Sequence, residues 1–569
     1  MKGRSSQRPE TILFVGAGAT QDLSMPTTSE QAQILWDICD CDRRRDEIKE
    51  QAKKARCFEK RSGDLADLLM VLDRAVDCKD DLLDRAFPCV AKKQRKELIQ
   101  QLRRQYDVEA LRFVAKAKKG DSKDEKPRDS YLQEVFTLID ACVRDNRGFA
   151  VFDGENEIFL SVERLKAAHV AMVLLINTMF ACAWQNLILK DKGALKPYRD
   201  FFLSLSKLMQ EEGRQFYSAG CKPNRPEFYQ FSYSLMTTNF EPVFLWLIWQ
   251  AHYVVNYEDE IRLGNPGRML KLMMNFPNSV GMSRLADLND KEKPENLDRC
   301  VWSPCTDAAA QMVNSENYLS NRLFRFGKYY PLHGMSVTRH CPMCGRLNLY
   351  MGDTWDANSK TLFNNGIIKA FNWGHVARTE KEKLAHRHGE YDALECHFCG
   401  ELTHSCDNFM FMQTQLKTLP PSFIKETTDE ALAGIAGAKH IVLLGYSMPL
   451  DDAIWGSLFT AMSRRKDGEK LYCSVAATYD EDGPDGWLYG KELEDYIERY
   501  THNRDEYEKV RAIENAIAVF GKENVRAYVK GIPNVFEDGD VNAVKALMYP
   551  CDQLGWDIPS FTPNGVVRS

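Results

Sequence analysis

The chain has 569 residues, of which 44% are hydrophobic and 27% are charged, and its formal net charge is −6. This length supports a substantial core and more than one structural unit, while the small negative charge does not favour a general nucleic-acid-binding surface. The 17 cysteines follow no short repeating framework, and an odd number excludes complete pairing. They indicate a reducing compartment rather than a disulfide scaffold.

The basic start of the chain is not followed by the apolar core of a signal peptide. The longest apolar run, Val170 to Trp184, is interrupted by Asn177 and is shorter than the roughly 20 residues that a membrane helix needs. We therefore expect a buried core helix here, no membrane association and a cytoplasmic protein.

The chain begins with an apolar strand, Thr11 to Val15, and a glycine turn follows it, Gly16-Ala17-Gly18-Ala19-Thr20. Such a turn can direct backbone N–H groups and a helix N-terminus at a phosphate. The dinucleotide-binding fingerprint has a third glycine three residues further on, where this chain has Gln21. The turn alone is therefore equally compatible with a strand-to-helix connection that binds no ligand.

Helical periodicity extends from about Gln31 to Tyr229 and includes a helix, Val162 to Lys190, that is apolar nearly all round. Strand character returns at Gln230–Thr238, before His333, at Ile441–Leu444 and at Tyr472–Ala477, with a helix pattern at Ala453–Arg465. This alternation predicts an α/β fold with a Rossmann-like, mostly parallel sheet and a large helical insertion. The expected division is 1–35 for the first strand and turn, 36–229 for the insertion, 230–335 for the continued sheet domain, 336–410 for a metal-binding module and 411–569 for the C-terminal half.

Four cysteines form two C-x2-C pairs, Cys341 with Cys344 and Cys396 with Cys399. A glycine follows each pair, which suits the turn of a zinc knuckle, and four thiolates satisfy the tetrahedral coordination of zinc. A closed set of four sulfur ligands leaves no open position, so we expect a structural zinc ion that does not take part in catalysis.

Two polar residues at predicted strand ends are candidates for chemistry. His333 precedes a glycine, and an imidazole with a near-neutral pKa can accept a proton from a ribose hydroxyl or a water molecule. Asn239 follows a strand, where its amide can orient a water molecule or a ribose hydroxyl. In isolation, His333 is more typical of a structural histidine and Asn239 of a turn asparagine. Glu241 in isolation is more typical of a surface carboxylate.

Taken in order, these motifs resemble the sirtuin superfamily. The matching segments are Gly16-Ala17-Gly18-Ala19-Thr20, Thr238-Asn239-Phe240-Glu241, His333-Gly334, the first cysteine pair shortly after it, and Gly445-Tyr446-Ser447. The resemblance implies a sirtuin fold with NAD as substrate, Asn239 holding the ribose and water, and His333 as base. It also implies nucleotide contacts, with Gly16, Ala17, Gly18 and Thr20 at the pyrophosphate, Gly445 and Ser447 on the adenosine side, Thr238 beside the asparagine, and Glu241 at the nicotinamide amide.

Departures from the protein deacylases of this superfamily indicate another activity. Thr238 replaces a glutamine and Glu241 an aspartate, and the valine-phenylalanine-glycine strand of the acyl-lysine tunnel is missing. In its place stands Leu419–Lys425, followed by Gly445-Tyr446-Ser447-Met448-Pro449-Leu450-Asp451-Asp452, a combination that looks like bacterial sirtuin-like proteins of antiphage defence. That resemblance implies a NAD⁺ hydrolase that releases nicotinamide and ADP-ribose in abortive infection and is inactive until triggered.

Two alternatives remain open at this point: a NAD-dependent protein deacylase, and a catalytically silent scaffold that binds NAD or ADP-ribose. An enzyme that depletes its own cell of NAD requires control, so we expect a homo-oligomer or a defence partner such as an ATPase or an Argonaute-like protein. The helical insertion is the expected interface, and no direct nucleic-acid binding is expected.

Overall fold

The structure, a computed structural model, describes residues 11–39, 41, 44–55, 58, 62–86, 91–120, 126–128, 130–153, 155–190, 192–218, 233–263, 269–275, 279–280, 322–349, 379–388, 390, 393–396, 398–404, 407–410, 422–448, 459–460, 470–502, 506–536, 540–550 and 554–556. The predicted helix Ala453–Arg465 therefore lies almost wholly outside the described residues. The same is true of Leu419–Pro421 and of Pro449–Asp452.

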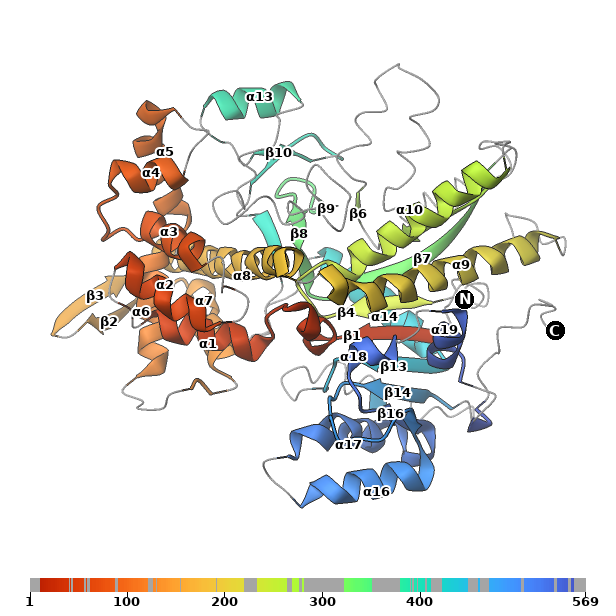
Figure 1. The fold of residues 1–569 in the computed structure, drawn as a ribbon. Helices are drawn as coiled ribbons and strands as arrows, with labels where there is room; N and C mark the ends of the chain where they lie inside the picture. Colours follow the sequence, from red (N-terminus) through yellow and green to blue (C-terminus); the bar gives the residue numbers. More distant parts are fainter. Residues whose placement is uncertain are drawn as a thin grey trace.

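An eight-stranded sheet forms the centre of the described chain (Figure 1). In spatial order its strands are β15 (Trp487–Leu488), β16 (Val525–Tyr528), β14 (Tyr472–Ala476), β13 (His440–Leu444), β1 (Thr11–Val15), β4 (Ser234–Thr237), β7 (Arg322–Pro331) and β5 (Met269–Asn275). Among these described strands only the β15–β16 pair is antiparallel. The predicted α/β fold with a mostly parallel sheet is confirmed, and so are the four later strands on which it was based.

Both faces of the sheet are buried, because alternate side chains of each strand enter two different cores. Leu13 and Val15 of β1 point into one core, and Ile12 and Phe14 point into the other. The first core includes α9 (Lys196–Ser218), α10 (Val243–Leu263), α18 (Ile532–Val535) and α19 (Val541–Met548). The second includes α14 (Ser422–Gly437), α16 (Gly490–Thr501) and α17 (Glu508–Phe520), with η9 (Lys522–Asn524) after it. Burial on both faces explains why these strands are continuous apolar runs in the sequence.

The chain between β1 and β4 is mostly helical and forms a lobe beside the sheet (Figure 1). After η1 (Ala17–Leu23) come α1 (Thr28–Cys39), α2 (Arg45–Lys54), α3 (Ser62–Leu72), α4 (Asp80–Ala86), α5 (Lys92–Gln105), α6 (Val108–Lys119), α7 (Tyr131–Arg144), α8 (Val162–Lys190) and η3 (Lys192–Leu195). The last helix before β4, α9, packs instead on the sheet beside α10.

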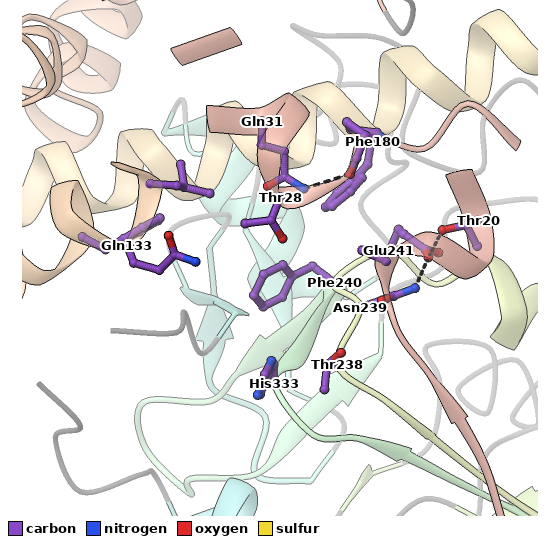
Figure 2. A pocket seen from close by; sticks show the side chains of 14 residues that line it. Thr20, Thr28, Gln31, Gln133, Phe180, Thr238, Asn239, Phe240, Glu241 and His333 are labelled. Atoms are coloured by element: carbon purple, nitrogen blue, oxygen red, sulfur yellow. Dashed lines mark hydrogen bonds between the residues drawn. The ribbon is translucent and has the colours of Figure 1, made fainter. Parts of the chain in front are cut away.

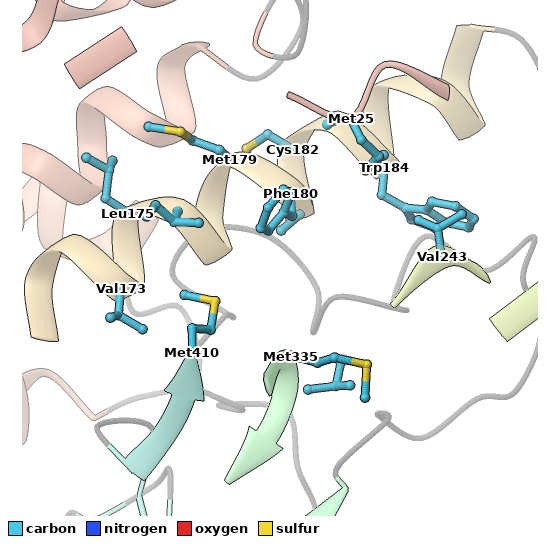
Figure 3. Close-up of a cluster of buried hydrophobic side chains, with 14 of the residues drawn as sticks. Met25, Val173, Leu175, Met179, Phe180, Cys182, Trp184, Val243, Met335 and Met410 are labelled. Carbon is cyan, nitrogen blue, oxygen red and sulfur yellow. The ribbon is translucent and has the colours of Figure 1, made fainter. Parts of the chain in front are cut away.

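The predicted interior helix is α8, which has the bounds that the sequence indicates. Among the described helices it alone is long and apolar enough to cross a membrane, and 83% of its most apolar window is buried within the protein. Figure 3 shows the reason: Trp184 of α8 lies beside Val243, and Phe180 belongs to the same buried cluster as Met335. It is therefore a buried core helix, as the sequence predicts.

One part of the predicted helical block is wrong. Strands β2 (Phe149–Asp153) and β3 (Asn156–Leu160) form an antiparallel hairpin there. Val151 and Leu160 on its inner face are buried, whereas Phe152 and Phe159 on the outer face are 67% and 65% exposed. This alternation of buried and exposed side chains is the period of a strand, which overrides the helical pattern of the flanking segments.

Two smaller sheets are formed mostly by the chain after β7, with β6 added from the chain before it. Strands β12 (Asn408–Met410), β8 (Gly334–His340), β9 (Leu347–Leu349) and β6 (Ser279–Val280) form one, and β10 (Leu394–Glu395) pairs with β11 (Leu402–Thr403). Helix α13 (Glu380–Arg387) lies next to β10. These elements surround the two cysteine pairs.

Candidate functional site

Three neighbouring parallel strands end at the same level. Val15 of β1 is in register with Thr237 of β4, which is in register with Pro331 of β7. Two further bonds continue the pairing, from Thr238 N–H to Val15 O at 3.2 Å and from Leu332 N–H to Thr237 O at 2.9 Å. The residues just beyond these strand ends are therefore neighbours at the carboxyl edge of the sheet, where α/β proteins bind ligands.

A pocket opens at this edge, between the sheet and the helical lobe (Figure 2). Its empty volume is about 630 Å³, which includes open solvent at its mouth. The sheet side is lined by Ala17, Thr20, Thr238, Asn239, Phe240, Glu241 and His333. The helical side is lined by Pro26, Thr28, Gln31, Leu132, Gln133, Phe136 and Phe180. Segments that lie far apart in the sequence thus meet around one cavity, with polar groups and aromatic rings on both sides.

The two glycine turns that the sequence analysis identified pack against each other. Gly16 N–H donates to Leu444 O at 2.9 Å, and Gly18 N–H donates to Gly445 O at 3.0 Å. Gly445 has a φ of +57°, and a Cβ on it would lie 1.9 Å from Ala19 N, so no other residue fits. The N–H groups of Gly16 and Gly18, which were expected to face a pyrophosphate, are used in this contact. Ala17, which stands between these two glycines, lines the pocket.

The side chain of Asn239 is buried, and both hydrogens of its amide are used. Nδ2 donates to Gly16 O at 3.1 Å and to Glu241 Oε1 at 2.8 Å. The backbone N–H donates to Thr237 Oγ1 at 3.0 Å. Since two acceptors face Nδ2, the hydrogen-bond network itself assigns the amide orientation. The remaining atom, Oδ1, is buried and has no hydrogen-bond partner among the described residues.

Glu241 is not a surface carboxylate but is only 4% exposed. Its Oε1 accepts from Thr20 Oγ1 at 2.9 Å and from Asn239 Nδ2, and its Oε2 accepts from Val243 N–H at 2.7 Å at the start of α10. Burial raises its pKa to about 7, and these hydrogen bonds oppose the shift. Both oxygens thus bind protein donors, which leaves the nicotinamide contact implied by the resemblance without geometric support.

His333 lies in the turn between β7 and β8 and is 7% exposed. The turn is tight, with a bridge between Leu332 and Gly334, and Gly334 has a φ of +78°, a conformation that favours glycine. The imidazole lies 6.2 Å from the ring of Phe240, between centroids. Figure 2 shows His333, Thr238 and Asn239 on the sheet side of the same pocket.

Six of the ten expected catalytic and nucleotide-binding residues line this pocket: Ala17, Thr20, Thr238, Asn239, Glu241 and His333. Gly16, Gly18 and Gly445 lie behind it in the contact between the turns. Ser447 is not among the described lining residues, and its carbonyl oxygen accepts a hydrogen bond from Asn515 Nδ2 at 2.9 Å.

The helical wall of the pocket was not anticipated. Gln31 comes from α1, Leu132, Gln133 and Phe136 come from α7, and Phe180 comes from α8. No motif marks these positions, because amphipathic helices use the same residue types in ordinary cores. The wall means that the lobe is part of the site.

The two cysteine pairs come together beside β9 and β10. The four sulfur atoms lie within 4.8 Å of one another, and two of the separations are 3.5 Å (Cys341–Cys399) and 3.8 Å (Cys344–Cys396). Four thiolates around one metal ion have edges of about 3.8 Å when each metal–sulfur bond is about 2.3 Å. Asn348 Nδ2 donates to Cys396 Sγ at 3.3 Å, a hydrogen bond that fixes the orientation of this sulfur. This cluster could hold a metal ion.

Comparisons with known proteins do not identify the chain. No protein-family model matches the sequence, and no curated protein matches it significantly.

Proposed function

We propose that the protein hydrolyses the nicotinamide–ribose bond of NAD⁺ and releases nicotinamide and ADP-ribose. The observation that carries this proposal is the unpaired, buried Oδ1 of Asn239 in a pocket that His333 also lines. A buried acceptor of this kind needs a donor, and a ribose hydroxyl or a water molecule supplies one. The ordered motifs that resemble sirtuins supply the identity of the ligand.

The chemistry requires little acid catalysis. The ring nitrogen of the bound nicotinamide is cationic, so the C1′–N bond breaks with its electron pair going to a neutral leaving group. Water then adds to the electron-poor C1′ and loses a proton. In this scheme Asn239 orients the water or a ribose hydroxyl through Oδ1, and His333 accepts the proton.

The rest of the nucleotide has fewer candidate contacts than the resemblance implies. Ala17 and Thr20 line the pocket and are the parts of the first turn that can meet the pyrophosphate. Gly16, Gly18 and Gly445 would shape this site by fixing the turn rather than through free N–H groups. An adenosine contact at Ser447 stays a proposal.

Product analysis tests the activity. The purified protein is incubated with NAD⁺, with and without an acetyl-lysine peptide, and the products are separated by chromatography. We expect nicotinamide and ADP-ribose under both conditions. Strict dependence on the peptide would identify a deacylase, and binding of NAD⁺ without any product would identify a scaffold.

The proposed enzyme is a cytoplasmic effector of antiphage defence that is held inactive in the cell until it is triggered, while the purified protein is expected to retain measurable turnover. The lobe is suited to control because its helices α1, α7 and α8 form one wall of the pocket. A movement of the lobe against the sheet would therefore change access to Asn239 and His333. Either a second copy of the chain, in a homo-oligomer, or a defence partner would bind this lobe.

The outer face of the β2–β3 hairpin is a specific candidate for that contact, because Phe152 and Phe159 are exposed there. Replacing both phenylalanines by serine should lower the assembly mass measured by light scattering. Tyr479→Ser, which removes an aromatic ring that is 65% exposed outside the lobe, is the matched control. An unchanged mass in the double variant would exclude the hairpin as the contact.

We also assign a structural zinc ion to the four-cysteine cluster. Elemental analysis should find zinc in the unmodified protein and in Cys78→Ser, whose sulfur lies outside the cluster, but not in Cys344→Ser. Four thiolates leave no open coordination position, so the zinc ion would stabilise the module and activate no water. Zinc retained at full occupancy in Cys344→Ser would contradict this assignment.

A further inference from the structure

Glu241 connects three elements that meet at the pocket. Its carboxylate accepts hydrogen bonds from Thr20 in η1, from Asn239 after β4 and from the first N–H of α10 at Val243. We propose that Glu241 is a positioning residue, which holds the Asn239 amide so that its carbonyl oxygen faces the pocket. This role rests on the proposed function and deepens it.

The orientation of the Asn239 amide decides whether the pocket presents a hydrogen-bond acceptor or a donor. In the observed orientation Nδ2 donates to Gly16 O and to Glu241 Oε1. An amide rotated by half a turn would bring its oxygen against these two acceptors, lose both hydrogen bonds and direct an NH₂ group into the pocket. Such a group cannot accept a hydrogen bond from a ribose hydroxyl or a water molecule. Glu241 and Gly16 together therefore determine that the ligand meets an acceptor.

Among the described residues, no cation donates a hydrogen bond to this carboxylate, which supports a functional role. The three groups that donate to Glu241 are all neutral. Its charge acts on two described tyrosines, Tyr198 of α9 and Tyr329 of β7, whose pKa values are raised chiefly by burial. A buried carboxylate without a counter-ion is costly, since burial raises its pKa to about 7. A glutamine or an apolar side chain would avoid that cost but would not accept from all three donors.

Thr20 strengthens the same arrangement. Its hydroxyl donates to the oxygen that also accepts from Asn239, and both side chains are almost completely buried. Tyr198 Oη donates to Ala19 O at 3.1 Å and so ties the adjacent turn to α9. The carboxylate is therefore held from one side by η1 and from the other by α10, which leaves it little freedom to turn away from Asn239.

The substitution Glu241→Gln separates this role from general packing, because it conserves shape but replaces one acceptor oxygen by a donor. The new NH₂ group must face either Val243 N–H or the Asn239 and Thr20 donors. We expect kcat for nicotinamide release to fall about 100-fold, while KM for NAD⁺ changes only a few-fold. Thr20→Val, which removes one donor and keeps the carboxylate, should have a smaller effect on kcat in the same direction.

A double-mutant cycle with Asn239→Ala tests whether Glu241 acts through Asn239. If it does, Asn239→Ala and the double variant Asn239→Ala/Glu241→Gln should have the same kcat within about threefold, since the amide to be positioned is already gone. Asp480→Asn, a change to a similarly buried carboxylate elsewhere in the sheet domain, is the control and should leave kcat unchanged in both backgrounds. Additive losses in the cycle would show that Glu241 only supports folding and would overturn the proposal.

Binding of ADP-ribose, measured by calorimetry on the same variants, separates this inference from the proposed function. Parallel losses of affinity in Glu241→Gln and Asn239→Ala, non-additive in the double variant, would support the positioning role without any turnover. An unmodified protein that neither cleaves NAD⁺ nor binds ADP-ribose would overturn both the function and the role. Turnover together with an additive cycle would overturn the role of Glu241 alone.

Discussion

Two buried carboxylates in the sheet domain have opposite environments. Asp480, which follows β14, is 1% exposed and accepts from Tyr500 Oη at 2.7 Å, from Tyr496 Oη at 3.1 Å and from the Lys509 ammonium at 3.2 Å. Burial alone would raise its pKa, but hydrogen bonds from Tyr500, Lys509 and Tyr496 outweigh burial and lower it. Among the described residues, Glu241 accepts hydrogen bonds only from neutral donors, and burial raises its pKa to about 7.

The difference distinguishes a carboxylate that stabilises the fold from one that serves a site. Asp480 has a cation beside it and joins the loop after β14 to α16 and α17. Glu241 has no cation among its hydrogen-bond partners, lines a pocket, and orients a neighbouring amide whose own oxygen is unpaired. Perturbed pKa values and unsatisfied buried groups tend to gather at functional sites.

The largest expected effect on stability comes from Asp480→Ala. It would remove the acceptor of two buried tyrosine hydroxyls and one of the two carboxylates that Lys509 contacts, so the free energy of unfolding should fall by about 3–5 kcal/mol. Denaturant unfolding measures this loss. NAD⁺ cleavage by the folded fraction should be unchanged, and a large loss of kcat would contradict the separation between the two carboxylates.

The pH dependence of stability should have opposite signs at the two sites. Glu241 has a folded pKa of about 7 against an ordinary value of 4.5, so the folded state binds more protons between these values. Its contribution to the free energy of unfolding should therefore fall by about 3 kcal/mol as the pH rises through this window. Asp480 has a lowered pKa, so its stabilisation is present at neutral pH and is lost as the pH falls through its folded pKa.

Unfolding measured as a function of pH for the unmodified protein and Glu241→Gln isolates the first of these contributions. The decline between about pH 4.5 and 7 should be smaller in the variant by the amount assigned to Glu241. Identical slopes in the two proteins would mean that the Glu241 carboxyl is not perturbed in the folded state.

Lys509→Met sharpens the comparison by removing the cation from Asp480. The ammonium is partly exposed, with 27% of its side-chain area accessible, so we expect only a small loss of stability at neutral pH. The acid unfolding midpoint should move to higher pH, because the carboxylate loses a partner that lowers its pKa. An unchanged midpoint would show that the hydrogen bonds from the two tyrosines are sufficient to stabilise the charged carboxylate of Asp480.

Much of the sheet was predictable from the sequence, since strands buried on both faces are continuous apolar runs such as Ile441–Leu444. Helix α8 was predictable for the same reason. The β2–β3 hairpin was not predicted, although Val151-Phe152-Asp153-Gly154 combines strand-favouring residues with a turn dipeptide. The segments on either side have helical periodicity, which conceals so short a strand signal.

The site was predictable only as far as local motifs reach. Asn239 and His333 stand at strand ends and beside turn residues, and both line the pocket. The role of Glu241 depends on Thr20, which lies 221 residues away in the chain, and on the start of α10. Tertiary contacts of that kind leave no pattern in a single sequence, and the same is true of the helical wall.

The most direct test of the account is the rate of nicotinamide release by the unmodified protein and by Asn239→Ala, at saturating NAD⁺ and without peptide. We expect release by the unmodified protein and a loss of about 100-fold or more in the variant, which should remain folded. Equal rates of release in the two proteins would contradict the claim that the buried carbonyl oxygen of Asn239 organises the reaction.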